Sequence, residues 1–269
     1  MPRLRRPKLG QHFLADARYP QRIVETLDIR PEELVIEIGA GRGAMTELLA
    51  ERARHLVAIE LDRALAELLQ RKQPAGFRIE VLCADVLTVD IGELCRRQGA
   101  PRCFVFGNLP YYITSPIIHH LFLFRDYIRA IALLMQREVA ERLAAAPGTR
   151  AYGYLSVLTQ LLSHPRVVTN VPAGAFSPPP RVQSALVEIR IRTAAETESL
   201  LPKDDVDKFL QFVKRCFEQK RKSLFNNLDG TYPRTRLELE FDRLLLAHSV
   251  RAEQLAVEEL VRLYRHLST

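Results

Sequence analysis

The sequence predicts an α/β protein with a Rossmann-like, mostly parallel sheet carrying an antiparallel edge strand, followed by a small all-α domain. Two observations support this prediction. Between residues 34 and 134, short β-type runs alternate with amphipathic helical stretches, which is typical of parallel strands joined by helices. Past residue 193 only helical patterns occur. We therefore expect two domains, residues 1–192 and 193–269.

The first domain contains five apolar runs that we expect to form parallel strands. They lie at residues 34–38, 55–59, 78–82, 103–106 and 128–134. Helical patterns follow them, beginning with residues 43–53 and 63–72. Two further runs, 166–171 and 185–191, are joined by a proline-rich loop without a helix. Such a pair is most simply antiparallel, at the edge of the same sheet.

The second domain starts with a polar stretch, residues 193–202, that we interpret as a linker. Apolar residues then recur at helical spacing, which predicts a bundle of short helices. These helices are expected at residues 204–217, 220–227, 235–247 and 253–266.

The composition excludes several classes of protein. The chain has 269 residues, of which 47% are hydrophobic and 26% charged, as in folded proteins rather than disordered chains. The four cysteines form no CxxC pair, so we expect no metal site. No apolar run approaches the roughly 20 residues that span a bilayer, and we expect no secretory signal. We expect a cytoplasmic protein without membrane contact.

The net charge of +7 is concentrated in two short patches. The first patch is Arg3, Arg5, Arg6 and Lys8, with no acid nearby, and the second lies at residues 214–222 around Lys220, Arg221 and Lys222. Basic patches favour a polyanionic partner, although solvated basic surfaces are the alternative.

A glycine-rich turn follows the first predicted strand. Gly39, Gly41 and Gly43 allow a ligand to approach the bare backbone at the start of a helix. Glu60 and Asp85 end the next two strands at the same sheet edge, where carboxylates can accept hydrogen bonds from ribose and from an adenine amino group. The pattern fits S-adenosylmethionine (SAM) sites and dinucleotide sites alike, and a tight turn without a ligand is the alternative.

The tetrapeptide Asn108-Leu109-Pro110-Tyr111 follows the fourth predicted strand and favours one chemistry. The exocyclic amine of a base is a poor nucleophile because its lone pair is delocalised into the ring. The Asn108 carboxamide oxygen and the Leu109 carbonyl, held by Pro110, could accept both amine hydrogens and free the lone pair for attack on a methyl group. Tyr111 offers a flat face on which an extruded base can stack. The alternative is an ordinary turn before a helix.

With these motifs in place, the sequence closely resembles the KsgA/RsmA family of rRNA adenine N6,N6-dimethyltransferases. Its wider relatives are the Erm rRNA methylases and the mitochondrial transcription factor B proteins. The resemblance covers nearly the whole chain. It is carried by residues 8–14, 35–46, 58–62, 83–87, 106–116, 134–139, 171–182 and 217–228.

The resemblance implies SAM as cofactor, with no metal. It places SAM contacts at His12, Leu14, Gly39, Gly41, Glu60, Asp85 and Asn108. Many family members carry Asn where this chain has His12, and a backbone contact would tolerate that difference. The resemblance also places Phe176 opposite Tyr111, where it would close the base pocket; an ordinary core aromatic is the alternative.

The implied reaction is dimethylation of two adjacent adenosines in a hairpin loop near the 3′ end of small-subunit (16S) rRNA, on a 30S assembly intermediate. We expect a monomer, with the first basic patch near the target strand and the second on rRNA phosphates. One alternative is a nucleic-acid-binding or ribosome-assembly factor with secondary methyltransferase activity. Another is an Erm-like 23S rRNA enzyme. An NAD-dependent oxidoreductase would explain the glycines but not residues 108–111.

Overall fold

The chain folds into two compact units. The structure is a computed structural model that describes residues 12–73 and 76–268. The first unit comprises the described residues up to Ala140 together with Arg166–Ile191, and the second comprises Glu141–Pro165 together with the described residues from Arg192 onward. The predicted RNA contacts Arg3, Arg5, Arg6 and Lys8 lie outside the described residues.

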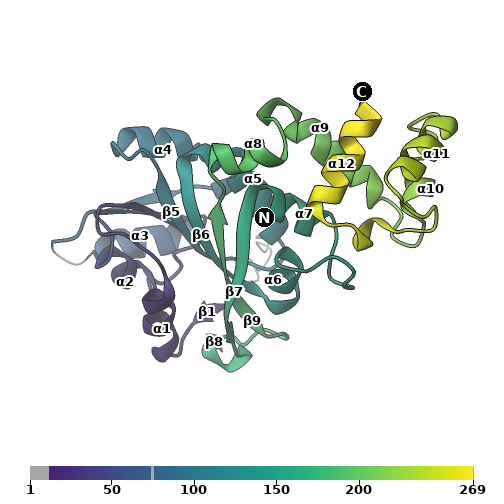
Figure 1. Ribbon diagram of the computed structural model, residues 1–269. Coiled ribbons are helices and arrows are strands. Elements are labelled where there is room, and N and C mark those ends of the chain that lie inside the picture. Colours follow the sequence, from purple (N-terminus) through teal and green to yellow (C-terminus); the bar gives the residue numbers. More distant parts are fainter. Residues whose placement is uncertain (1–11, 74–75, 269) are drawn as a thin grey trace, which may run out of the picture. The chain divides into compact units, whose positions relative to one another are not determined.

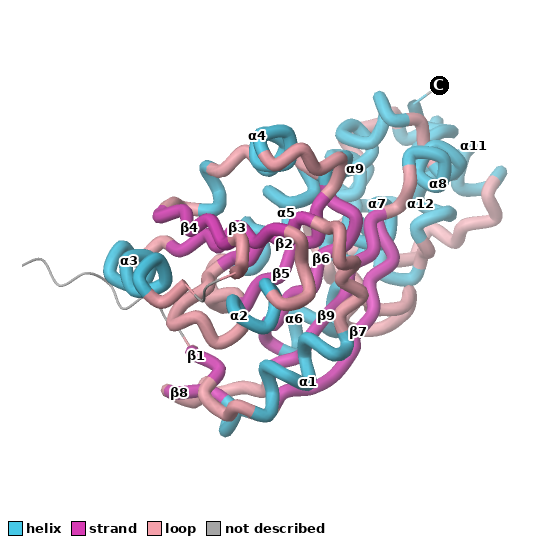
Figure 2. The backbone as a smooth tube through the Cα atoms, turned by 90° about the vertical axis from the view of Figure 1, so that its left-hand side faces the viewer, coloured by secondary structure: helices cyan, strands magenta, loops and turns pink. Residues whose placement is uncertain are grey.

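The first unit is built on a sheet with the strand order β4-β3-β2-β5-β6-β9-β7 (Figure 2). The first five strands in this order pair in parallel, and β9 runs antiparallel to β6. This confirms the predicted Rossmann-like sheet; the antiparallel strand stands second from the edge, with β7 outside it. The bounds are β2 Leu34–Ile38, β3 His55–Glu60, β4 Ile79–Cys83, β5 Cys103–Asn108, β6 Ile128–Gln136, β7 Ser163–Val171 and β9 Ser184–Ile191.

A small second sheet pairs two short strands from distant parts of the sequence. Strand β1 (Phe13–Leu14) runs antiparallel to β8 (Phe176–Ser177), with Leu14 opposite Phe176. Neither strand was predicted from the sequence, because two residues carry no periodic pattern. This pairing holds the chain just after His12 beside the loop that precedes β9.

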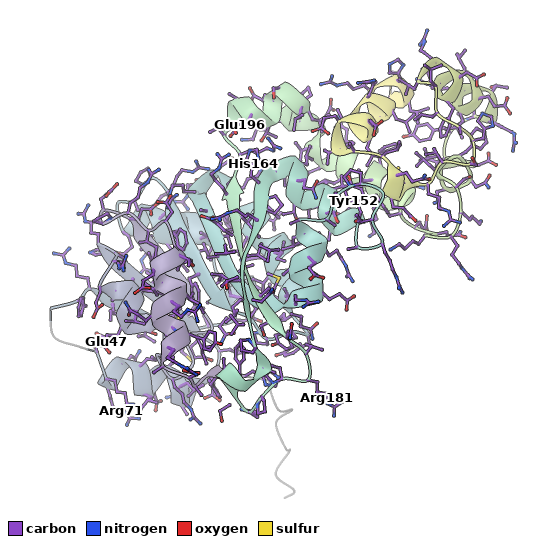
Figure 3. All side chains as sticks on the ribbon, turned by 60° about the horizontal axis from the view of Figure 1, so that its bottom comes forward. Glu47, Arg71, Tyr152, His164, Arg181 and Glu196 are labelled. Carbon is purple, nitrogen blue, oxygen red and sulfur yellow. The ribbon has the colours of Figure 1, made fainter. Side chains whose placement is uncertain are left out.

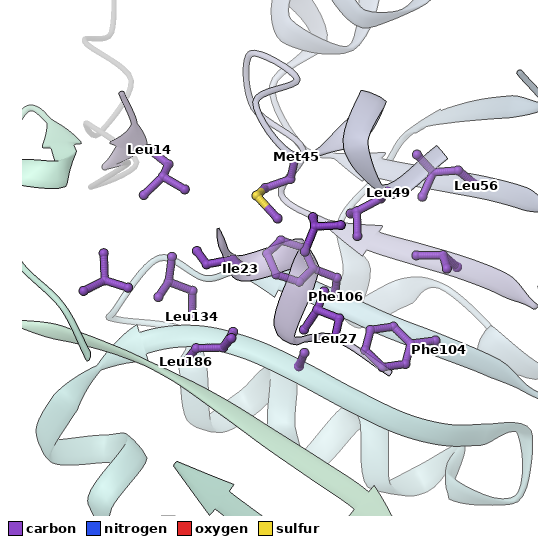
Figure 4. Close-up of a cluster of buried hydrophobic side chains, with 14 of the residues drawn as sticks. Leu14, Ile23, Leu27, Met45, Leu49, Leu56, Phe104, Phe106, Leu134 and Leu186 are labelled. Atoms are coloured by element: carbon purple, nitrogen blue, oxygen red, sulfur yellow. The ribbon is translucent and has the colours of Figure 1, made fainter. Parts of the chain in front are cut away.

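Helices cover both faces of the large sheet (Figures 1 and 2). Buried residues of α1 and α2, such as Ile23 and Leu49, pack with Phe104 and Phe106 of β5 in one apolar cluster (Figure 4). Helix α5 lies on the other face and buries Ile117 (Figure 2). The helices between residues 18 and 123 are α1 Arg18–Thr26, α2 Thr46–Ala50, α3 Arg63–Arg71, α4 Ile91–Arg97 and α5 Thr114–Leu123. Helix α2 is shorter than the predicted helix at residues 43–53.

The second unit is helical, as predicted. Its core includes Phe209, Phe212 and Tyr264, whose rings lie 5.5–6.2 Å apart. Its α-helices are α7 Tyr154–Leu162, α8 Ala194–Leu200, α9 Val206–Cys216, α10 Leu224–Leu228, α11 Arg234–Arg243 and α12 Val257–Ser268. Helix α6 (Arg137–Leu143) contains the boundary at which the chain first passes from the first unit to the second.

The structure differs from the sequence-based domain division in one segment. The division predicted at residues 192 and 193 leaves Glu141–Pro165 in the first domain, whereas this segment belongs to the second compact unit. The reason is packing: α7 contacts α9 and α12, and the Leu162 carbonyl accepts a hydrogen bond from the Arg192 N–H.

The predicted linker at residues 193–202 is wrong, because this stretch contains α8. The Thr193 hydroxyl accepts from the Glu196 N–H while the Glu196 carboxylate accepts from the Thr193 N–H, which is a capping box. Glu196 also contacts His164, beside which it lies in Figure 3. The Thr-x-x-Glu pattern could have revealed this helix start.

Candidate active site

The predicted polar residues meet at the carboxyl edge of the sheet. Gly39 follows β2, Asp85 follows β4, and Glu60 and Asn108 are the last residues of β3 and β5. Because β4, β3, β2 and β5 are parallel neighbours, their ends lie side by side. Gly39 lines two adjoining cavities, one shared with Glu60 and Asp85 and the other with Asn108.

The glycine-rich turn leaves a bare backbone surface. Gly39 and Gly41 have φ angles of 72° and 59°, in the left-handed region that favours glycine. A Cβ on Gly41 would lie 3.1 Å from carbon atoms of the Phe13 ring, so β1 packs directly on this turn. A side chain at Gly41 would therefore strain the backbone and require the Phe13 ring to shift by a few tenths of an ångström.

Glu60 is held rigidly by the backbone. Its side chain is buried, Oε2 accepts from the Gly41 N–H at 2.8 Å, and Oε1 accepts from the Asp62 N–H at 2.9 Å. A carboxylate offers about four acceptor positions, so two bonds leave capacity for ribose hydroxyls. The same contacts connect Glu60 to the glycine-rich turn.

Asp85 lies in a cavity with apolar walls. Its Oδ1 accepts from the Leu87 N–H at 3.0 Å, while Ile59, Val86 and Ile117 line the same cavity. Apolar walls beside a carboxylate acceptor suit a purine ring that carries an amino group. Tyr112, 62% exposed, also lines this cavity and was not among the predicted site residues.

The Asn108 side chain has a defined orientation. Its Nδ2 donates to the His12 backbone carbonyl at 3.2 Å, which leaves Oδ1 as the acceptor of the amide. The next residue is anchored as well, because the Leu109 N–H donates to the Leu134 carbonyl at 3.1 Å. The edge of β5 therefore presents carbonyl-type acceptors on a fixed backbone.

Tyr111 is fixed at both its hydroxyl and its ring. The hydroxyl forms a 2.7 Å hydrogen bond with Ser184 Oγ, and burial raises the pKa of the phenol. The imidazole of His12 packs 5.5 Å from the Tyr111 ring, and His12 Nδ1 lies 2.8 Å from the Pro178 carbonyl oxygen. His12 thus contacts Asn108 through its backbone and Tyr111 through its side chain.

We expect His12→Asn to retain kcat and the SAM dissociation constant within about threefold of wild type, a difference below about 1 kcal/mol. The physical reason is that the hydrogen bond to Asn108 uses the His12 backbone carbonyl, which the substitution keeps. Methyl transfer and calorimetric SAM binding measure both quantities. A tenfold loss of either would show that the imidazole itself takes part.

Phe176 lies in the hydrophobic core of the first unit. It is 4% exposed and clusters with Leu14 and Leu134. Its ring belongs to this buried cluster, so a role in closing a base pocket over Tyr111 stays a prediction.

Glu37 is a buried acid that was not among the predicted site residues. It is 2% exposed in the central strand β2, lines the cavity of Asn108, and its Oε2 has no hydrogen-bond partner within the described part of the chain. Burial raises the pKa of Glu37 to about 7, and the nearby Glu60 carboxylate adds to this while Thr46 opposes it. An acid inside the apolar run Leu-Val-Ile-Glu-Ile was the available signal.

We expect Glu37 to make stability depend on pH. With its pKa raised from 4.5 to about 7, its contribution to folding is fully present at low pH and is lost as the pH rises through 7. The unfolding free energy of wild type minus that of Glu37→Gln should therefore fall, on the order of 3 kcal/mol in total, between pH 4.5 and 8. Urea unfolding measures this. Glu47→Gln, on the exposed surface of α2 (Figure 3), is the control, and equally flat differences for both variants would contradict the assignment.

The basic residues Lys220, Arg221 and Lys222 are exposed in the turn between α9 and α10 of the second unit. Lys220 Nζ donates to the Arg150 carbonyl at 2.9 Å. Asn227 stabilises the turn, because its Nδ2 donates to the carbonyls of Cys216 and Gln219 and its Oδ1 accepts from the Gln219 N–H. The turn therefore presents its cations on a defined backbone.

Within residues 12–73 and 76–268, no helix has the length and apolar character that a bilayer span requires. No group of three or more His, Cys, Asp or Glu side chains in this part of the chain could hold a metal ion.

Comparison with known proteins accounts for this arrangement. A family model described as ribosomal RNA adenine dimethylase matches residues 3–269. Two curated proteins named ribosomal RNA small subunit methyltransferase A are similar: one from Koribacter versatilis (38% identity, 98% of this chain and 94% of that protein) and one from Acidobacterium capsulatum (41%, 97% and 91%). Among solved structures, the 23S rRNA methyltransferase ErmE aligns with a TM-score of 0.73 at 30% identity, covering 96% of this chain and 100% of ErmE. A dimethyladenosine transferase from Plasmodium falciparum, with a TM-score of 0.78 at 24% identity over 94% and 96% of the two chains, shows the same fold. The chain belongs to the ribosomal RNA adenine dimethylase family.

Proposed function

We propose that this chain transfers methyl groups from SAM to the N6 amino groups of two adjacent adenosines in the hairpin loop near the 3′ end of small-subunit rRNA. The observation that carries the proposal is the Asn108 amide: the His12 carbonyl binds its Nδ2, so that Oδ1 is available at the cavity shared with the glycine-rich turn. An amine substrate needs an acceptor of this kind.

The residues at the sheet edge fit SAM. The bare backbone at Gly41, the buried carboxylate of Glu60 and the unpaired oxygen of Glu37 are the observations that support the fit. Glu60 would accept hydrogen bonds from the ribose hydroxyls, Asp85 would accept one from the adenine amino group, and Glu37 would face the ammonium group. When bound, SAM supplies an electrophilic methyl group on its sulfonium centre.

The chain's own part in the reaction is to orient the amine. Asn108 Oδ1 and the Leu109 carbonyl would each accept one hydrogen of the adenine amine, which directs the nitrogen lone pair away from the ring. The Tyr111 ring, fixed through Ser184, would stack on the extruded base. No side chain has to act as a strong base, since the methylated amine is acidic enough to lose its proton to water. Positioning supplies most of the rate.

The small subunit is favoured as substrate over the large one. Relatives named for the small subunit reach 38–41% identity, against 30% for the solved 23S enzyme. A hairpin loop within a 30S assembly intermediate is a physically reasonable target, because unpaired bases splay out at little energetic cost. A monomer acting in the cytoplasm completes the proposal.

A radiolabel experiment tests the proposal. Undermethylated small subunits and, separately, large subunits are incubated with the protein and methyl-labelled SAM, and nucleosides are separated after digestion. We expect label in N6,N6-dimethyladenosine from small subunits only. Label from large subunits would favour the Erm-like alternative, and binding to small subunits without any label would favour an assembly factor.

Replacing Lys220, Arg221 and Lys222 together with Gln should weaken binding to small subunits and flatten its salt dependence. Each lost phosphate contact should reduce the log–log slope by about 0.7–0.9, so three contacts give a change of about 2–3. SAM affinity should not change, because these residues belong to the second unit and the cavities of Gly39 to the first. An unchanged slope would make this turn an ordinary solvated surface.

A further inference from the structure

The first unit contains another cavity, at the edge of the sheet opposite to the candidate active site. It has a volume of about 530 Å³, and its walls include Leu34 and His55, which begin β2 and β3, and Arg102, which precedes β5. Strands advance about 3.3 Å per residue, so the length of β2 places this cavity roughly 17 Å from Gly39. It shares no residue with the cavities of Gly39.

Arginines dominate the charge of this cavity. Arg129 is neutralised, since its guanidinium pairs with the carboxylates of Glu33 and Asp28. Glu33 also accepts from the Arg30 backbone N–H at 2.9 Å, which holds it in place. Three other arginines of the cavity wall have no carboxylate partner among the residues that the structure describes: Arg30, Arg54 and Arg102. Glu32 is the one remaining acid of that described wall.

Arg102 has an unsatisfied donor. Its Nη2 donates to the Arg125 carbonyl at 3.2 Å, while its Nε is buried and has no hydrogen-bond partner in the described chain. A buried donor without a partner costs about 1–3 kcal/mol, more for a charged group. The Nε is enclosed by protein atoms, so Arg102 contributes its positive charge to the cavity wall rather than a free donor at this atom.

The remaining groups around the cavity limit the kind of ligand. His55 Nε2 lies 3.0 Å from Arg78 Nη1, and because a guanidinium only donates, the imidazole nitrogen accepts there and is engaged. His55 Nδ1 lies 2.7 Å from Gln98 Oε1 and is also engaged. The described wall contains no Phe, Tyr or Trp on which a base could stack. Guanidinium forks match the paired oxygens of phosphate, so the cavity suits a phosphodiester rather than a base.

We propose that this cavity binds a backbone phosphate of the RNA substrate, as a contact separate from both the active site and the Lys220–Lys222 turn. The inference rests on the proposed rRNA substrate, which is the polyanion that this enzyme would meet in every catalytic cycle. Phosphate contacts fix position and orientation without reading sequence. The cavity would thus orient the RNA while Asn108 and Tyr111 select the base.

The test uses the full-length protein and two charge-matched double variants. Arg30→Gln/Arg54→Gln removes exposed cations of the cavity, and Arg22→Gln/Arg71→Gln removes two exposed arginines outside it, of which Arg71 is labelled in Figure 3. Binding to undermethylated small subunits and to isolated small-subunit rRNA is measured from about 50 to about 200 mM salt. Because the cavity is proposed to bind one phosphate, its variant should lose about 0.7–0.9 in log–log slope on both, and the control should lose much less. SAM affinity should be the same in all three proteins.

Three results would overturn the inference. Equal loss of slope in both double variants would indicate general attraction rather than a site. Loss of binding to subunits with unchanged binding to isolated rRNA would indicate a ribosomal protein as the partner. Unchanged slopes would indicate a small-anion site if inorganic phosphate also raises the melting temperature of the wild type but not that of the cavity variant. Wild-type protein that binds rRNA but yields no dimethyladenosine would refute the proposed reaction and leave the slope comparison valid.

Discussion

Asn108→Ala is expected to lower the rate of methyl transfer by at least about 10³-fold, while the SAM dissociation constant stays within about threefold. The variant loses the Oδ1 acceptor for the adenine amine, and it also loses the Nδ2 bond to the His12 carbonyl. Both losses affect the orientation of the target base. Neither touches Glu60 or Asp85, whose backbone bonds do not involve Asn108.

Single-turnover transfer to small subunits and calorimetric SAM binding separate these two effects. Asn170→Ala, an exposed asparagine of β7, is the matched control and should retain full activity. If Asn108→Ala transfers methyl groups within tenfold of the wild-type rate, the amide does not orient the amine. If SAM affinity falls as much as the rate, Asn108 acts mainly in cofactor binding.

The sheet and its carboxyl edge were predictable because both depend on local patterns. Strand β2 was predicted with its observed bounds, since a mostly apolar run that ends at a glycine is a strong local signal. Its parallel neighbours then bring Glu60 and Asn108 to one edge, whatever the details of the loops. What each side chain contacts at that edge could not be predicted, because Gly41 and His12 reach Glu60 and Asn108 from distant positions in the sequence.

The features that sequence patterns missed depend on long-range packing. His12 meets Asn108 because β1 pairs with β8, and strands of two residues have no periodicity to detect. Segment Glu141–Pro165 joins the second unit through side-chain packing such as that of Tyr152 with Phe217, whose rings lie 6.2 Å apart. No local pattern reports such a contact.

Glu60→Gln is expected to raise the SAM dissociation constant by about 100-fold, which corresponds to about 2.7 kcal/mol. The two carboxylate oxygens accept from the N–H groups of Gly41 and Asp62, so an amide of the same shape must turn its NH₂ toward one of these donors. That donor is left unpaired in a buried site, and the ribose hydroxyls lose a charged acceptor. Calorimetric titration with SAM measures the effect.

The structural and the ligand-binding roles of Glu60 can be separated by their different readouts. A purely structural role would lower the unfolding free energy of Glu60→Gln, by about 1–3 kcal/mol for one unpaired buried donor, without weakening SAM binding once the protein is folded. If Glu60 binds the ligand, Glu60→Gln should weaken SAM binding even in fully folded protein. Adenosine, which keeps the ribose hydroxyls, should lose affinity by the same factor as SAM. In contrast, 2′,3′-dideoxyadenosine should bind wild type and variant equally well. Glu47→Gln controls for the change of charge, since Glu47 is exposed on α2 and lines neither cavity of Gly39. If Glu60→Gln weakens the binding of adenosine and of 2′,3′-dideoxyadenosine by the same factor, Glu60 does not bind the ribose hydroxyls. Its role would then be only to hold Gly41 and Asp62 in place.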